Sequence, residues 1–185
     1  MTGWFLIPQV SFDAVSELYV EKPRAAAVVG GAILDAVIHE TLKARLPVEG
    51  RTRDGLLNPA GGRLGDVDTK TKLLYVLGVL SKPAFTDAQL IGSIRNKFAH
   101  RLEISTFDDP IIVDLCNELT LIDTVVFSLS HIGEESSVGR RYWESDLEEK
   151  RKDPKQRFIV TIRVLTEAMI EIAPDARPSR MRQLI

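Results

Sequence analysis

The chain has 185 residues, 44% of them apolar and 27% charged, and its formal net charge is −2. This composition is typical of a folded globular domain and excludes a disordered chain. The small negative charge provides no overall attraction to nucleic acid or anionic lipid, and the single cysteine, Cys116, excludes an internal disulfide and cysteine-cluster metal sites. We therefore expect a single-domain cytoplasmic protein without a metal or a cofactor.

The first long predicted element is an apolar helix at 23–46. Pro23 suits the first helical turn, because its missing N–H would have no intrahelical partner there. Residues 25–34 are apolar on every side, which predicts a central position in a helical bundle. The longest apolar stretch, residues 25–38, is interrupted at Asp35 and is too short to span a bilayer, so no membrane segment is expected. Gly30 and Gly31 each cost about 1 kcal/mol relative to Ala in a helix, and they predict the close approach of a neighbouring helix.

Two further helices are predicted in the middle of the chain. Residues 47–67 are rich in Gly, Arg and Asp and predict a long loop. Asp66 or Asp68 is expected to cap a helix at 69–80. A capping box at 86–89 predicts the start of the next helix. The apolar residues expected to face inward in these helices are Leu73, Leu74, Val76, Leu77, Leu80, Leu90, Ile91, Ile94 and Phe98.

Two Asp–Pro steps predict the last two helices. Asp109 precedes Pro110 at the start of a helix that continues to about His131, and Asp153 precedes Pro154 at the start of the final helix. Apolar residues recur with a helical period in both. Their inward-facing residues are Ile112, Leu115, Leu119, Ile122, Val126, Leu129, Phe158, Ile159, Ile162, Leu165, Met169 and Ile172.

These elements predict an all-α fold, a single-domain helical bundle of six or seven helices. Residues 1–22 are expected to form an N-terminal segment with a short helix capped by Ser11, residues 23–173 the bundle, and residues 174–185 a basic C-terminal tail. The polar segment 133–152 predicts a solvated helix or a mobile arm.

The residues with the clearest chemical potential are Arg95, Asn96 and His100. Arg binds phosphate through its two-pronged guanidinium group, and His acts as a general acid or base near neutral pH. Asn96 and His100 share one helix face, whereas Arg95 is rotated by about 140° from His100. Within one chain, Arg95 and His100 would reach the same atom only if the helix ended near Ala99, and a dimer would solve this by letting both chains line one cleft.

A structural role explains the same residues. A cationic His100 at a helix end interacts favourably with the helix dipole. Arg95 is expected to be buried and paired with Asp35 of the central helix, so that Arg95 and His100 would be internal struts. The sequence leaves both interpretations open and favours the structural one.

Other candidate groups have simple structural explanations. Asp35 and His39 lie four residues apart and would suit a base and its orienting carboxylate, but a third group is missing. Asp108 and Asp109 form a carboxylate pair, although helix capping by Asp109 explains half of it. The glycine-rich loop matches no nucleotide-binding motif. A charged region suits stacking on bases or anchoring a protein partner equally well, and it contains Arg140, Arg141, Tyr142 and Trp143.

Several stretches together resemble the mannitol operon repressor family. The two most specific blocks are Arg-Asn-Lys-Phe-Ala-His at 95–100 and Phe-Asp-Asp-Pro at 107–110. The resemblance implies an all-helical transcriptional regulator that has no DNA-reading domain of its own and acts through protein contacts. The other matching stretches are 24–35, 64–65, 71–80, Pro154 and 157–159.

The spacing of Arg95 and His100 is also similar to the Arg-x4-His motif of the HEPN superfamily. Many of those proteins cleave RNA as dimers, and this resemblance implies that Arg95, Asn96 and His100 are the catalytic set of a metal-independent endoribonuclease.

The preferred hypothesis is a dimeric, non-enzymatic regulator that binds a protein partner and not DNA, with RNA as a ligand only under the nuclease alternative. A third interpretation is an antitoxin or immunity-like partner that keeps the fold without the chemistry. The structural or partner-binding candidates are Asp35, Arg95, His100, Asp108 and Asp109.

Overall fold

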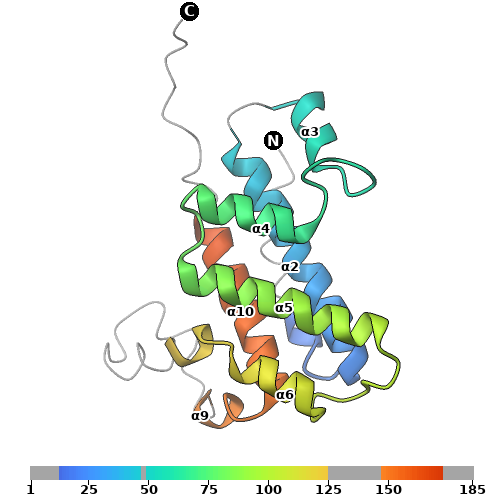
Figure 1. Ribbon diagram of the computed structural model, residues 1–185. Coiled ribbons are helices and arrows are strands. Elements are labelled where there is room, and N and C mark those ends of the chain that lie inside the picture. Colours follow the sequence, from blue (N-terminus) through green and yellow to red (C-terminus); the bar gives the residue numbers. More distant parts are fainter. Residues whose placement is uncertain (1–12, 47–48, 125–146, 173–185) are drawn as a thin grey trace, which may run out of the picture.

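The computed structural model describes residues 13–46, 49–124 and 147–172 (Figure 1). These ranges contain helices and no strands, so the predicted all-α class is confirmed. Residues 13–17 and 121–124 are also helical. The principal helices are α2 (Pro23–Arg45), α3 (Arg51–Leu57), α4 (Val67–Val76), α5 (Lys82–His100), α6 (Pro110–Asn117), α9 (Leu147–Lys150) and α10 (Pro154–Ile172).

The division into 1–22, 23–173 and 174–185 stays a prediction. Ser11 and the basic tail lie outside the described residues. Residues 133–146 of the predicted polar arm also lie outside them, and its remaining part contains the short helix α9.

Helix α2 has the central position that its sequence predicts. It begins at Pro23 and packs against α4, α5 and α10. Figure 1 shows α4 and α5 crossing in front of it. Within the described chain, α2 alone has the length and apolar composition of a membrane span. Its packing against three other helices accounts for this composition.

The two glycines of α2 allow neighbouring helices to approach closely, as predicted. A Cβ atom on Gly30 would lie 2.7 Å from Ile162 Cδ1 and 3.0 Å from the Phe158 ring, both on α10. A Cβ on Gly31 would lie 2.5 Å from Cγ and 2.9 Å from Cβ of Arg95 on α5. The backbone of α2 is therefore in contact with side chains on two sides.

The middle of the chain differs from the prediction in three places. The predicted loop at 47–67 contains the short helix α3. Helix α4 is capped by Asp66 and ends at Val76, after which Gly78 turns the chain with φ = 70°. The prediction that Val76 and Leu77 face inward is wrong: both are exposed, because Val76 lies on the face of α4 opposite the buried Leu74 and Leu77 follows the end of the helix.

Helix α5 begins earlier than the capping box at 86–89 predicts. Ser81 is the N-cap, its hydroxyl accepts a hydrogen bond from the Ala84 N–H, and Pro83 lies in the first turn. Asp87 is therefore inside α5 and its carboxylate caps a different helix. It accepts hydrogen bonds from the backbone N–H groups of Thr120 (2.9 Å) and Leu121 (2.8 Å).

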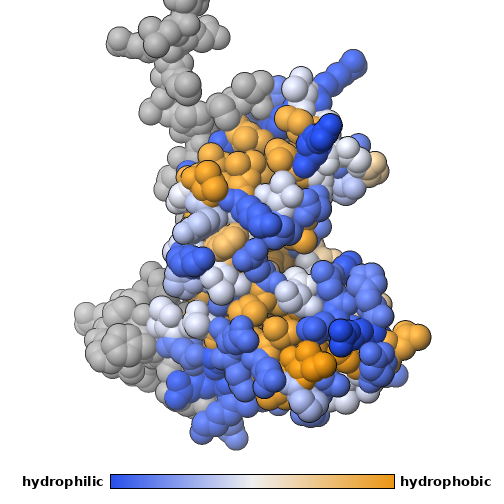
Figure 2. Space-filling model, viewed as in Figure 1, coloured by the Kyte–Doolittle hydropathy of each residue, from blue (hydrophilic) through white to orange (hydrophobic). Residues whose placement is uncertain are grey.

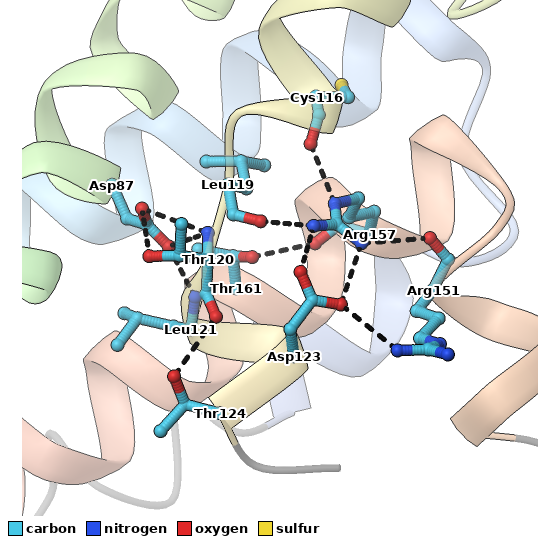
Figure 3. A network of polar contacts seen from close by, with 10 residues as sticks. All are labelled: Asp87, Cys116, Leu119, Thr120, Leu121, Asp123, Thr124, Arg151, Arg157 and Thr161. Carbon is cyan, nitrogen blue, oxygen red and sulfur yellow. Dashed lines mark hydrogen bonds and ion pairs between the residues drawn. The ribbon is translucent and has the colours of Figure 1, made fainter. Parts of the chain in front are cut away.

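The helix predicted from Asp109 to His131 is interrupted. Asp109 caps α6 as expected, but α6 ends at Asn117 and a second helical segment begins at Leu121. The backbone groups freed by the interruption find partners on other helices, since Asp87 binds the N–H groups and Arg157 binds carbonyl groups (Figure 3). Residues 125–131 lie outside the described part of the chain.

The core lies between α2, α5, α6 and α10. Three aromatic rings pack together within it: the ring centroid of Phe107 is 4.9 Å from that of Phe98 and 5.3 Å from that of Phe158. Of the residues predicted to face inward, most are buried. These are Leu74, Leu80, Ile91, Ile94, Phe98, Ile112, Leu119, Ile122, Phe158, Ile159, Ile162, Leu165 and Met169.

The glycine contacts predict opposite effects for two Gly→Ala substitutions. Gly31→Ala should lower the free energy of unfolding by about 1–3 kcal/mol, because the new methyl group overlaps the Arg95 stem close to its backbone. Gly92→Ala, inside α5 and facing open space, should raise it by about 0.5–1 kcal/mol through better helix propensity. Urea unfolding measures both, and a stable Gly31→Ala variant would contradict the close packing.

Candidate functional site

The residues of the Arg-x4-His motif lie on the second half of α5. The stem of Arg95 covers Gly31 of α2, and its Nη1 donates a hydrogen bond to Asn96 Oδ1 at 2.9 Å. Arg95 is half-buried, whereas Asn96 and His100 are exposed. Asn96 and His100 are four residues apart and share a helix face, so both are available to a ligand.

The predicted ion pair between Arg95 and Asp35 is not the one that forms. Asp35 instead binds the ammonium group of Lys70, which reaches α2 from α4. The Lys70 side chain is only 1% exposed, whereas that of Asp35 is 43% exposed. A half-exposed carboxylate therefore compensates a fully buried positive charge. The sequence analysis missed Lys70, because a lysine within an otherwise polar helical turn carries no signal of burial.

His39 lies one turn after Asp35 on α2. Burial lowers the pKa of His39 below its ordinary value of 6.5, and the nearby Lys70 ammonium lowers it further. The imidazole is therefore neutral at pH 7. Within the described residues, no group of three His, Cys, Asp or Glu side chains is placed to hold a metal ion.

Arg24 connects the start of α2 to the end of α5. Its guanidinium group donates hydrogen bonds to the carbonyl oxygens of Phe98, Leu102 (3.1 Å) and Ile104 (2.6 Å). These carbonyls belong to the last turn of α5 and the loop that follows, where a helix leaves acceptors unpaired. Arg24 is thus a C-terminal cap supplied by another helix.

Arg157 has the same role at the end of α6 (Figure 3). Its Nε donates to the Cys116 carbonyl at 2.8 Å, and Nη2 donates to the Leu119 carbonyl. The guanidinium group also forms a two-point ion pair with Asp123. Beside this network, burial raises the pKa of the Cys116 thiol to about 12, so the thiol remains protonated and unreactive at neutral pH.

The two carboxylates at 108 and 109 have separate contacts. Asp109 accepts a hydrogen bond from the Ile111 N–H at 3.0 Å, as a helix cap. Asp108 accepts one from the Thr106 hydroxyl at 2.9 Å. The charged region around Tyr142 and Trp143 lies outside the described residues.

These contacts define an all-α domain in which several charged side chains hold helices together. The chain matches the mannitol repressor family over residues 53–169, more than half of its length. It belongs to the mannitol repressor family. No match was found among curated protein sequences.

Two solved structures are similar in fold. One is a possible transcriptional regulator, YggD, from Shigella flexneri, with 19% sequence identity and a TM-score of 0.58 over 88% of this chain and 98% of that one. The other is MtlR in the MtlR–HPr complex from Escherichia coli, with 17% identity and a TM-score of 0.57 over 86% and 97%.

The contact between Lys70 and Asp35 predicts unequal effects for its two partners. Asp35→Asn should lower the free energy of unfolding by about 3 kcal/mol, because it leaves the buried Lys70 ammonium uncompensated. Lys70→Met keeps the apolar stem and leaves Asp35 in contact with water, so it should cost less than about 1 kcal/mol. Equal losses in urea unfolding would contradict this assignment.

The lowered pKa of His39 predicts a pH dependence of stability. The unfolded chain binds a proton at His39 near pH 6.5, whereas the folded chain binds it only at lower pH, so folding stability falls as the pH drops below about 6.5. In His39→Gln the melting temperature should decrease less between about pH 7.5 and 5.5 than in the unmodified protein. Identical pH profiles would show that His39 makes no contribution.

Proposed function

We propose that this protein is a cytoplasmic, non-enzymatic regulator of transcription that works as a homodimer through contacts with other proteins. The observation that carries the proposal is membership of the mannitol repressor family over residues 53–169. The structure of a relative of similar fold in complex with HPr supports a protein as the partner.

The polar contacts are consistent with this role. Arg24, Lys70, Asp87 and Arg157 all bind groups of neighbouring helices, so their charges stabilise the bundle. The formal net charge of −2 gives no general attraction to DNA. Regulation would then depend on the protein surface that the bundle displays.

Binding to HPr tests the proposal directly. Purified HPr from the same organism is titrated into the protein in a calorimeter, and duplex DNA from the promoter region of the protein's own gene is titrated separately. We expect saturable binding of HPr and no specific binding of DNA at physiological salt. Tight, sequence-specific DNA binding without any binding of HPr would overturn the proposal.

A metal-independent endoribonuclease is the second candidate function. It is favoured by the exposure of Asn96 and His100 on one face of α5 and by the hydrogen bond from Arg95 to Asn96. Across a dimer, these residues would bind a phosphate and transfer a proton.

RNA cleavage in EDTA distinguishes the two candidates. Total RNA is incubated with the unmodified protein, Arg95→Ala and His100→Ala, after circular dichroism has confirmed that the variants fold. Cleavage that both substitutions abolish would establish the nuclease. Intact RNA at high protein concentration would leave the regulator as the function.

A further inference from the structure

An exposed surface at the end of α5, the following loop and α6 combines apolar residues with charges of both signs. We call it the α5–α6 surface. None of its side chains takes part in the helix caps that Arg24 and Arg157 supply from other helices. Its residues are the half-buried Lys97 and the exposed His100, Arg101, Leu102, Glu103, Asp108, Ile111, Asp114 and Glu118.

Two large apolar side chains lie on the α5–α6 surface. Leu102 is 85% exposed and Ile111 is 41% exposed. On the face shown in Figure 2, hydrophobic and strongly hydrophilic residues lie next to each other over this region. A single exposed leucine is common, so it is the combination of Leu102 and Ile111 with the charges around them that favours a contact here.

The charges on the α5–α6 surface are separated. Lys97, His100 and Arg101 provide basic groups at the end of α5. The acidic groups begin after Leu102 and continue along α6, where Ile111, Asp114 and Glu118 follow the i, i+3, i+7 spacing of one helix face. The surface therefore has a basic end at α5 and an acidic end at α6. Its apolar residues are Leu102 in the loop and Ile111 on α6.

The loop that carries Leu102 is fixed before any partner binds. Arg24 holds the carbonyl groups of Leu102 and Ile104, and Asp109 caps the start of α6. Thr106 and Asp108 add two hydrogen bonds within the loop. An ordered loop loses little conformational entropy on binding, which favours association.

We propose that the α5–α6 surface is the contact between two copies of this chain, so the inference rests on the homodimer of the proposed function. In a two-fold contact the same patch lies on both sides, and it must therefore be complementary to itself. The basic end of one copy then faces the acidic end of the other, with Leu102 and Ile111 between them. The balance of charges does not suit RNA, which requires a positive surface.

Analytical ultracentrifugation of the full chain and single variants tests the surface. We expect the unmodified protein to be a dimer, and Leu102→Ser to raise its dissociation constant at least tenfold. Arg101→Glu and Asp114→Lys should each have a similar effect alone. An equimolar mixture of these two charge variants should restore the dimer, because each copy then offers the charge that the other requires. Val76→Ser, which changes an exposed apolar residue at the end of α4, is the matched control and should leave the dissociation constant unchanged.

The possible failures are distinguishable. A monomeric unmodified protein at about 100 µM would overturn both the homodimer and this surface. If the unmodified protein is a dimer and Leu102→Ser, Arg101→Glu and Asp114→Lys all leave its dissociation constant unchanged, only the assignment of this surface is wrong, whatever the effect of the control. If Leu102→Ser reduces HPr binding in the calorimeter and leaves the dimer intact, the surface binds a different protein and the assignment to a second copy is wrong.

Discussion

The close packing of α2 against its neighbours is the constraint on which the other contacts depend. Gly30 lets Ile162 and Phe158 of α10 touch the backbone of α2, and Gly31 does the same for the stem of Arg95. With α2 fixed at this distance, Arg24 at its start reaches the end of α5, and Asp35 in its middle meets Lys70 of α4. A larger side chain at either glycine would move the helices that these polar contacts join.

A second feature of this fold is that the ends of helices are capped by side chains from other helices. Helices commonly end at a residue that satisfies their own last carbonyl groups, often a glycine. Here α5 and α6 end where arginines from other helices supply the donors, Arg24 and Arg157 respectively. This arrangement links the ends of helices to the packing of the core. It also leaves the loop around Leu102 ordered and exposed, which suits recognition of another molecule.

The same part of α5 enters every functional interpretation of this chain. Asn96 and His100 are exposed there, and the basic end of the α5–α6 surface adjoins them. In a dimer through this surface the motif residues of each chain would lie near the acidic end of the other chain, whereas the nuclease candidate requires the motif residues of both chains in one cleft. Dimer formation and RNA cleavage therefore depend on neighbouring residues but are measured independently. Family membership favours the regulator.

The sequence by itself determined the helical class, the central position of α2 and most of the core, because hydrophobic period, proline position and local capping depend only on nearby residues. It also identified Asp109 as a cap, whose bond spans two residues. Only the tertiary structure decided the partner of Asp35, the interruption of the helix after Asn117 and the exposure of Val76. The first two depend on side chains that approach from distant helices, and the third depends on which face of α4 packs against its neighbours. Spacing along the chain does not encode such contacts, because they form only once the helices have packed.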